Sequence, residues 1–333
     1  MPGRLRRTSP QQPGWTRRRC GRGFVYLDEQ GLPLDAADVQ RCRELVIPPA
    51  WRDVWICPHP NGHLQAVGLD DAGRRQYLYH PRWIEQRSAE KHARVLRFGR
   101  RLPALRTRVV EDLGSGRLDA PAVCAVAVRM LDLGCFRIGS DVYAAENGSF
   151  GLTTLERRHV RRRGGVLTFD FVGKSGVEHH VEIDDPGVVE MVERMRRRRA
   201  EDLALLAWRD GPSWRPLTPA DVNDYLRSLV GMEASAKDFR TWHGTVLAAA
   251  ALAEAPEPTS RRIVQRAVAS AMREVADYLG NTPALARSAY VDPRVVDLYE
   301  EGCTIRAAVR RSYPGPDERR TGLERATLRL LAG

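Results

Sequence analysis

The chain has 333 residues, of which 53 are Lys or Arg and 42 are Asp or Glu, so its formal net charge at pH 7 is +11. An excess of this size favours a polyanionic partner. Hydrophobic residues make up 43% of the chain, which supplies a packed interior and excludes global disorder. No apolar run is long enough to cross a bilayer, and the six cysteines include no Cys-x-x-Cys pair. We therefore expect neither membrane insertion nor disulfides nor structural zinc.

The amino end is the most basic part of the chain. Residues 1–22 contain seven arginines and no acidic residue, together with several Pro, Gly and Gln. This composition predicts a flexible basic arm that lies along phosphates, or a disordered segment that only improves solubility.

Residues 23–88 predict a small antiparallel sheet domain. Short strand-like runs at 24–27, 53–57, 63–67 and 76–79 are separated by turn sequences such as Pro-Asn-Gly. One short helix is expected to begin near Asp35.

Residues 89–333 predict a larger, mainly α-helical domain. Three short strands joined by tight glycine-rich turns are expected within 158–183. The predicted fold class is therefore α+β: a small antiparallel β-sheet N-terminal domain, then a mainly helical domain with a small three-stranded sheet. Amphipathic segments predict helices at 82–113, 120–134, 185–199, 218–230, 240–253, 258–279 and 321–331.

Five polar residues in apolar or glycine-rich surroundings form a set suited to phosphoryl transfer. Arg137 and Arg240 offer planar guanidinium groups, which match the non-bridging oxygens of a phosphodiester. Tyr290 offers a hydroxyl that can attack phosphorus, Lys174 a proton for a departing alkoxide, and Asn281 an amide donor. Each also has an ordinary explanation, such as an ion pair, an exposed turn residue or a core aromatic.

Two other patterns suggest metal or nucleotide chemistry only weakly. The spacing of Cys57, His59 and His63 spans a turn and lacks a fourth ligand, and the pair His179 and His180 reads as part of a strand. No Walker or Rossmann glycine loop is present in the sequence. We therefore expect no metal, cofactor or nucleotide.

The order and context of these residues resemble the type IB DNA topoisomerases, especially the small poxvirus-like and bacterial branch. The resemblance covers about residues 24–310. It is carried by GCFRIG at 134–139, VGKSG at 172–176, KDFRTW at 237–242, the segment 281–290, IPPAW at 47–51 and GLDDAGRRQYLY at 68–79.

The resemblance implies a role for each candidate residue. Tyr290 would be the nucleophile that forms a 3′-phosphotyrosyl intermediate without ATP, and Lys174 the general acid for the 5′-oxygen. Arg137 and Arg240 would hold the non-bridging oxygens. Viral and nuclear members usually have histidine where this chain has Asn281, so Asn281 would donate a hydrogen bond but not a proton. The alternative is that Asn281 only caps a helix.

The resemblance also implies a set of DNA contacts. Tyr77 and Tyr79 would share one face of a strand in the major groove, unless that face packs the sheet core. Lys237 would touch the DNA backbone, or else begin a helix in an ion pair with Asp238. At Ser140 the viral pattern has lysine, so the viral sequence preference is not carried over. The expected DNA-contacting residues are Arg75, Gln76, Tyr77, Tyr79, Gly139, Ser140, Tyr143 and Lys237.

The implied partner is duplex DNA, held by a monomer that closes around it as a clamp with the stretch 82–92 as its hinge, in the bacterial cytoplasm or nucleoid. Two alternatives remain open. A tyrosine recombinase or integrase shares the arginine, lysine and tyrosine chemistry, but usually has a helical N-terminal domain. A non-catalytic DNA-binding protein could keep the fold without using Tyr290.

Overall fold

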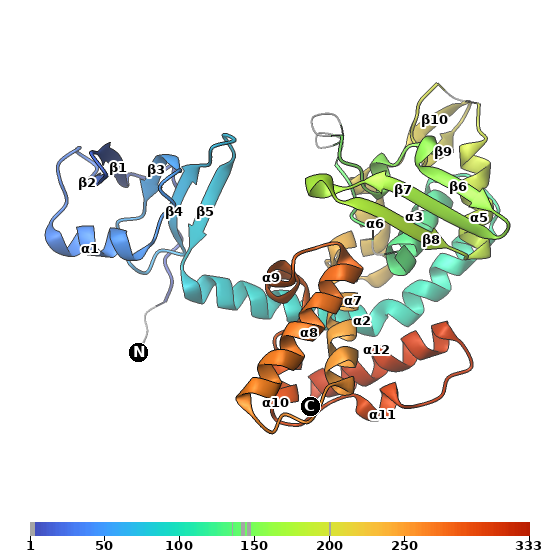
Figure 1. Ribbon diagram of the computed structural model, residues 1–333. Coiled ribbons are helices and arrows are strands. Elements are labelled where there is room, and N and C mark those ends of the chain that lie inside the picture. The colour runs from blue at the N-terminus through green and yellow to red at the C-terminus, as the bar shows by residue number, and fades with distance from the viewer. Residues whose placement is uncertain (1–3, 135, 141–143, 145–147, 200) are drawn as a thin grey trace. The chain divides into compact units, whose positions relative to one another are not determined.

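The computed structural model describes residues 4–134, 136–140, 144, 148–199 and 201–333 (Figure 1). The chain divides into two compact units, Met1–Lys91 and His92–Gly333. Among the described residues, no helix combines the length and apolar character that crossing a membrane requires.

The first unit is a five-stranded antiparallel sheet with one helix. The strands lie in the order β2-β1-β3-β4-β5. Helix α1 is capped by Asp35, whose side chain accepts from the backbone N–H of Asp38, and it buries Cys42 in the sheet's apolar core. The elements are β1 (Trp15–Cys20), β2 (Gly23–Leu27), α1 (Ala36–Glu44), β3 (Arg52–Ile56), β4 (Leu64–Leu69) and β5 (Arg75–Tyr79).

The prediction of a flexible arm over residues 1–22 is wrong for the residues described. Trp15–Cys20 is a strand between β2 and β3, anchored by the buried ring of Trp15. The preceding segment is also bound, because the Arg6 N–H donates to the carbonyl of Asn61 (2.9 Å) and the His63 N–H donates to the carbonyl of Arg6 (2.9 Å). The guanidinium of Arg17 donates to the Ile47 carbonyl (2.9 Å), so this arginine stabilises the first unit in addition to carrying charge.

The second unit is mainly helical, and α2 (Pro81–Gly114) leads into it from the first unit. Its three-stranded antiparallel sheet has the order β6-β7-β8. A two-stranded pair, β9 and β10, lies outside the predicted elements. The elements after α2 are α3 (Ala120–Gly134), β6 (Val160–Arg163), β7 (Val166–Val172), β8 (Glu178–Ile183), α5 (Pro186–Arg196), β9 (Ala207–Asp210), β10 (Ser213–Pro216), α6 (Pro219–Val230), α7 (Ala236–Glu254), α8 (Arg261–Leu279), α9 (Pro283–Leu285), the π-helical turn η4 (Ala286–Tyr290), α10 (Arg294–Glu300), α11 (Arg306–Val309) and α12 (Pro316–Ala332). The predicted α+β fold class is confirmed.

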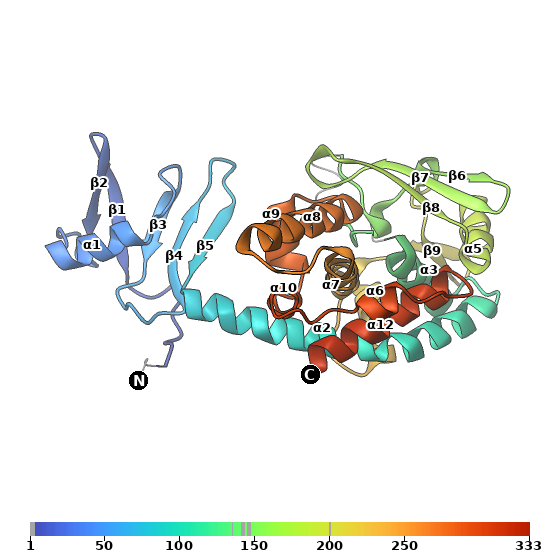
Figure 2. The same ribbon diagram turned by 60° about the horizontal axis from the view of Figure 1, so that its bottom comes forward.

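Two helices form the centre of this unit. Ten of the fifteen residues of α3 are buried, and α3 packs against α5, α6, β8 and β9. Helix α7 buries most of its residues and packs against α8, α10, α11 and α12. Figure 2 shows it beside α8, α10 and α12. Burial on most of its surface places α7 in the core of the unit. Arg137 follows α3 and Arg240 lies on α7, so both are attached to the most buried helices.

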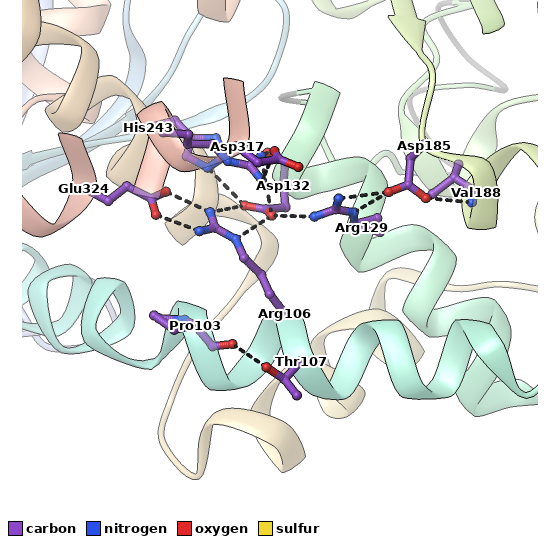
Figure 3. Close-up of polar contacts among 11 residues, drawn as sticks. Pro103, Arg106, Thr107, Arg129, Asp132, Asp185, Val188, His243, Asp317 and Glu324 are labelled. Carbon is purple, nitrogen blue, oxygen red and sulfur yellow. Dashed lines mark hydrogen bonds and ion pairs between the residues drawn. The ribbon is translucent and has the colours of Figure 1, made fainter. Parts of the chain in front are cut away.

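A buried ion cluster joins four of these helices (Figure 3). Arg106 on α2 donates two hydrogen bonds to Asp132 on α3 (2.8 Å each) and two to Glu324 on α12 (2.7 and 2.8 Å). Oδ1 of Asp132, which also accepts from Arg106, lies 3.4 Å from Nε2 of His243 on α7. Burial alone would raise the pKa of Asp132, but hydrogen bonds with His243 and Arg106 outweigh it and lower that pKa. The cluster thereby holds together the helices that bear the two arginines.

Candidate active site

Arg137 is the centre of a polar cluster. One of its terminal nitrogens, Nη2, donates to the carbonyl of Gly280 and to Oδ1 of Asn281, both at 2.7 Å. The other, Nη1, lies 3.2 Å from Nε2 of His179. Burial and then the nearby charge of Arg240 lower the pKa of Arg137, but a guanidinium remains cationic under any ordinary condition. A permanent, half-buried positive charge is thus fixed beside Asn281.

Arg240 and Lys237 lie on the same face of α7, one turn apart, and both approach the ring of Tyr290. The guanidinium carbon of Arg240 is 5.2 Å from the ring centroid, and Nζ of Lys237 is 5.9 Å from it. Arg240 is almost completely buried and donates to the carbonyl of Leu279 (2.7 Å). Tyr290 therefore sits in a strongly positive environment.

The segment that carries Tyr290 has an unusual backbone. After the left-handed C-cap Gly280, Thr282 caps α9, and the chain then forms a π-helical turn that ends at Tyr290. The N–H of Val291 donates to the carbonyl of Ala286 (3.1 Å) and closes this turn. Isolated π turns occur frequently at functional sites, where they re-aim a side chain.

Asn281 has one amide donor without an acceptor in the described part of the chain. Its Oδ1 accepts from Arg137, whereas Nδ2 is buried and, among the described residues, has no hydrogen-bond acceptor. An unmatched buried donor costs about 1–3 kcal/mol, so an oxygen of a bound ligand would relieve that cost.

Lys174 lies apart from this cluster. It is exposed in the short turn between β7 and β8, where the Gly173 N–H donates to the Val177 carbonyl (2.7 Å) and Ser175 adopts a left-handed φ of 66°. None of the contacts described for the chain joins its ammonium to Arg137, Arg240 or Tyr290. The link between this turn and the cluster is His179 on β8, which the sequence had suggested only as part of a weak metal pattern.

The histidines and the cysteine of the two suggested metal patterns form hydrogen bonds with other groups. Among the described residues, no group of three or more His, Cys, Asp or Glu is placed to hold a metal ion. The Cys57 thiol donates to the His59 carbonyl (3.4 Å), Nδ1 of His63 accepts from the Thr8 N–H (3.1 Å), and His180 bonds Asp170 (2.7 Å).

In the first unit, β5 presents an aromatic pair to solvent. Tyr77 and Tyr79 are 46% and 36% exposed, and their rings stack with centroids 6.1 Å apart. This face is therefore not the packed face of the sheet. Strand alternation places Arg75 on the same side and Gln76 on the other, where the Gln76 amide donates to Asp70 (2.8 Å). Gln76 thus does not share the tyrosine face.

The remaining predicted DNA contacts are near Arg137 and on α7. Gly139 and Ser140 are half-buried in the loop after Arg137, and Lys237 is exposed. Tyr143 lies outside the described residues. The sequence reasoning thus identified most of the cluster and missed His179, because two adjacent histidines on a strand carry no signal of a contact with an arginine 42 positions away.

Comparisons with known proteins identify related enzymes. Residues 80–306 match the family described as the catalytic core of eukaryotic DNA topoisomerase I, and residues 23–70 match the N-terminal domain of bacterial DNA topoisomerase IB. The chain is 28% identical over 294 residues to a DNA topoisomerase 1B of Acanthamoeba polyphaga mimivirus, covering 86% of the chain and 88% of that protein. It is 24% identical over 243 residues to DNA topoisomerase I of monkeypox virus, and 22% identical over 245 residues to DNA topoisomerase 1B of vaccinia virus (strain Copenhagen). Each of these two matches covers 71% of the chain and 72% of the relative.

Proposed function

The chain belongs to the type IB DNA topoisomerases, in the bacterial and poxvirus-like branch, and we propose that it relaxes positive and negative supercoils by cutting one DNA strand with Tyr290. The Tyr290 hydroxyl attacks a backbone phosphorus and loses its proton, the bond to the 5′-oxygen breaks, and that oxygen gains a proton. A 3′-phosphotyrosyl bond and a free 5′-hydroxyl result, and the strand rotates before the reverse reaction reseals it. No ATP is needed, because one phosphodiester replaces another.

The observation that carries this proposal is the convergence of Arg137, Arg240 and Asn281 beside Tyr290. In-line attack spreads negative charge over the non-bridging oxygens, and donors fixed in advance stabilise that charge without reorganising. Arg137 and Arg240 bind those oxygens. Nδ2 of Asn281 supplies a third donor, in agreement with its lack of an acceptor among the described residues.

Lys174 is proposed as the general acid for the departing 5′-oxygen. Its turn would reach the scissile phosphate when DNA is bound. Lys174→Ala should slow cleavage of ordinary DNA by about 10²–10⁴-fold, the usual contribution of a positioned proton donor. On a duplex with sulfur in place of the 5′-oxygen at the mapped cleavage site, the variant should cleave as fast as wild type, since a thiolate leaves unprotonated. A variant that stays slow on the sulfur substrate assigns Lys174 to binding.

Duplex DNA contacts in the first unit are proposed for Tyr77 and Tyr79, with Arg75 on the same face. Two exposed stacked rings beside a cation suit a groove wall, since the rings offer apolar area and hydroxyl groups together.

The test of the proposed function is plasmid relaxation in EDTA without ATP. Wild type should relax both signs of supercoil, and Tyr290→Phe should form no covalent adduct and relax none. Tyr313→Phe, which removes a hydroxyl bonded to the Ala308 carbonyl near α11, is the matched control and should stay active. If wild type binds DNA but relaxes no plasmid, the chain is a non-catalytic DNA binder, and if Tyr290→Phe relaxes plasmid as wild type does, Tyr290 is not the nucleophile. Exchange of strands between two linear substrates would instead indicate a recombinase.

A further inference from the structure

The ring of His179 is packed against an aromatic side chain and two glycines. Its ring stacks on Phe171 (centroids 5.1 Å apart, 17° between planes), and Phe171 stacks in turn on Phe136 (5.9 Å, 15°). Gly173 and Gly280 approach the ring closely, because a Cβ added to either would lie 2.5 or 2.7 Å from a ring carbon of His179. Gly280 also has a φ of +59°, which favours glycine in its own right. The ring thus has one position, with Nε2 directed at Arg137.

The contact with Arg137 fixes the protonation state of this histidine. A guanidinium N–H can only donate, so Nε2 of His179, 3.2 Å away, accepts, and the ring proton is on Nδ1. Burial, followed by the charges of Arg137 and Arg240, lowers the pKa of His179. The neutral ring is therefore the form that fits.

We propose that neutral His179 is a positioning residue for Arg137, orienting its guanidinium toward the scissile phosphate and tying it to the hairpin that bears Lys174. Without the Nε2 acceptor, Arg137 keeps the bonds from Nη2 to Gly280 and Asn281, but its Nη1 side loses the contact that ties it to β8. Protonation of His179 would place an N–H donor against the Arg137 donor and separate them. A loss of orientation lowers the rate of the chemical step more than it lowers DNA affinity.

The other charged or titratable groups around the ring do not replace this contact. They line a cavity of about 250 Å³ beside it. His180 is bonded to Asp170 on the opposite side of the strand. Besides Arg137 and Arg240, these groups are Glu178, His180, Asp277 and Tyr278.

Two substitutions distinguish the effect of the Nε2 acceptor from the effect of ring stacking. His179→Phe keeps the stack on Phe171 and removes the acceptor, whereas His179→Gln removes the stack and keeps an amide oxygen near the Nε2 position. With enzyme in excess over supercoiled plasmid, His179→Phe should form the covalent adduct at least tenfold more slowly, with DNA affinity within about threefold of wild type. His179→Gln should recover most of the rate, and His180→Gln should match wild type. A fast Phe variant with a slow Gln variant would overturn the proposal, because the ring would then act only by packing.

The pH profile provides a second test. As pH falls below the ordinary histidine value of about 6.5, wild type should lose adduct-forming rate relative to His179→Gln, which does not titrate there. A ratio that stays constant through the pH range in which NMR shows His179 titrating would contradict the proposal.

This inference rests on the proposed function, so one measurement is independent of activity. In Tyr290→Phe protein without DNA, NMR titration should give His179 a pKa below its usual range that rises when Arg137 is replaced by Met. If wild type relaxes no DNA, the proposed function fails while this titration still tests the contact. An unchanged His179 titration in the Arg137→Met protein rejects the contact whatever the enzyme's activity.

Discussion

Removing Arg106 should destabilise the second unit more than removing any surface arginine. Arg106 is 14% exposed, and its four hydrogen bonds engage Asp132 and Glu324, which are 3% and 7% exposed. In Arg106→Met the apolar stem of the side chain is kept, but Glu324 loses both of these bonds. Asp132 keeps weaker contacts, with His243 at 3.4 Å and Arg129 at 3.6 Å.

The expected loss is about 3–5 kcal/mol in the free energy of unfolding, as for other buried pairs that lose one partner. Four hydrogen bonds to charged groups, at about 1.5–3 kcal/mol each, would suggest more. Part of that sum is cancelled because the variant no longer has to desolvate a guanidinium. Against a total stability of about 5–15 kcal/mol, a loss of this size should be easy to measure.

Urea unfolding followed by circular dichroism measures the change through the midpoint at constant slope. Arg108→Met is the matched control, because Arg108 is 59% exposed and pairs with Glu111 at 3.2 Å on the surface of the same helix. This substitution should cost less than about 0.5 kcal/mol. Adding Glu324→Gln to Arg106→Met should restore part of the loss, since it removes an unpaired buried charge.

The stability lost in Arg106→Met should also depend on pH. In wild type the pKa of Asp132 is depressed, so the stability it contributes is present at neutral pH and disappears as pH falls through that depressed value. In Arg106→Met the buried carboxyl of Asp132 loses the Arg106 hydrogen bonds that lower its pKa, and it binds a proton more readily. The deficit of the variant should therefore shrink between pH 7 and pH 5. A deficit below 1 kcal/mol at pH 7, or one that does not change with pH, would refute this account of the cluster.

Three further substitutions test other parts of the structure. Val46 is 80% exposed with a φ of +48°, where a β-branched residue is strained, so Val46→Asn should raise the unfolding free energy by about 1 kcal/mol in urea unfolding; an equal or lower midpoint would contradict the strain. Lys237→Ala should weaken DNA binding and reduce the slope of log K against log salt by about 1, and an unchanged slope would remove Lys237 from the phosphate contacts. Asn281→Asp keeps the acceptor for Arg137 but loses the Nδ2 donor, so adduct formation should fall about 10²-fold; a wild-type rate would leave Asn281 only its contact with Arg137, since Thr282 is the cap of α9.

Local patterns were sufficient to predict much of the fold. The helix predicted at 120–134 has those bounds, and the strands on both sides of the Lys174 turn follow from glycine-rich turns between alternating runs. Strand β1 was missed because Arg17, Arg18 and Arg19 resemble a solvated charge run. Their pairing with β2 and the anchoring by Trp15 depend on residues that are distant in the sequence.

In the candidate site, too, the sequence did not predict features that depend on contacts between distant residues. Motif order was enough to select Arg137, Arg240, Asn281 and Tyr290, which the structure brings together, while their catalytic roles remain proposals. The sequence contains no signal for the stack that holds His179 or for the π turn before Tyr290, because both are set by contacts between separate elements. That Nδ2 of Asn281 has no acceptor among the described residues also depends on the positions of groups that are distant in the sequence.

The preference for arginine over lysine has a physical reason at the buried positions of the candidate site. Lysine supplies only three of the 53 basic residues. Arg240 is 3% exposed, and burial strongly lowers the pKa of a lysine, so a lysine there would tend to lose its charge where a guanidinium keeps it. Lys174 is exposed in a turn, where an ammonium stays solvated and can exchange its proton. The proposed mechanism needs fixed charge at the phosphate oxygens and a transferable proton at the leaving oxygen, so it favours arginine at the buried positions and lysine at the exposed turn, and the two are not interchangeable at either place.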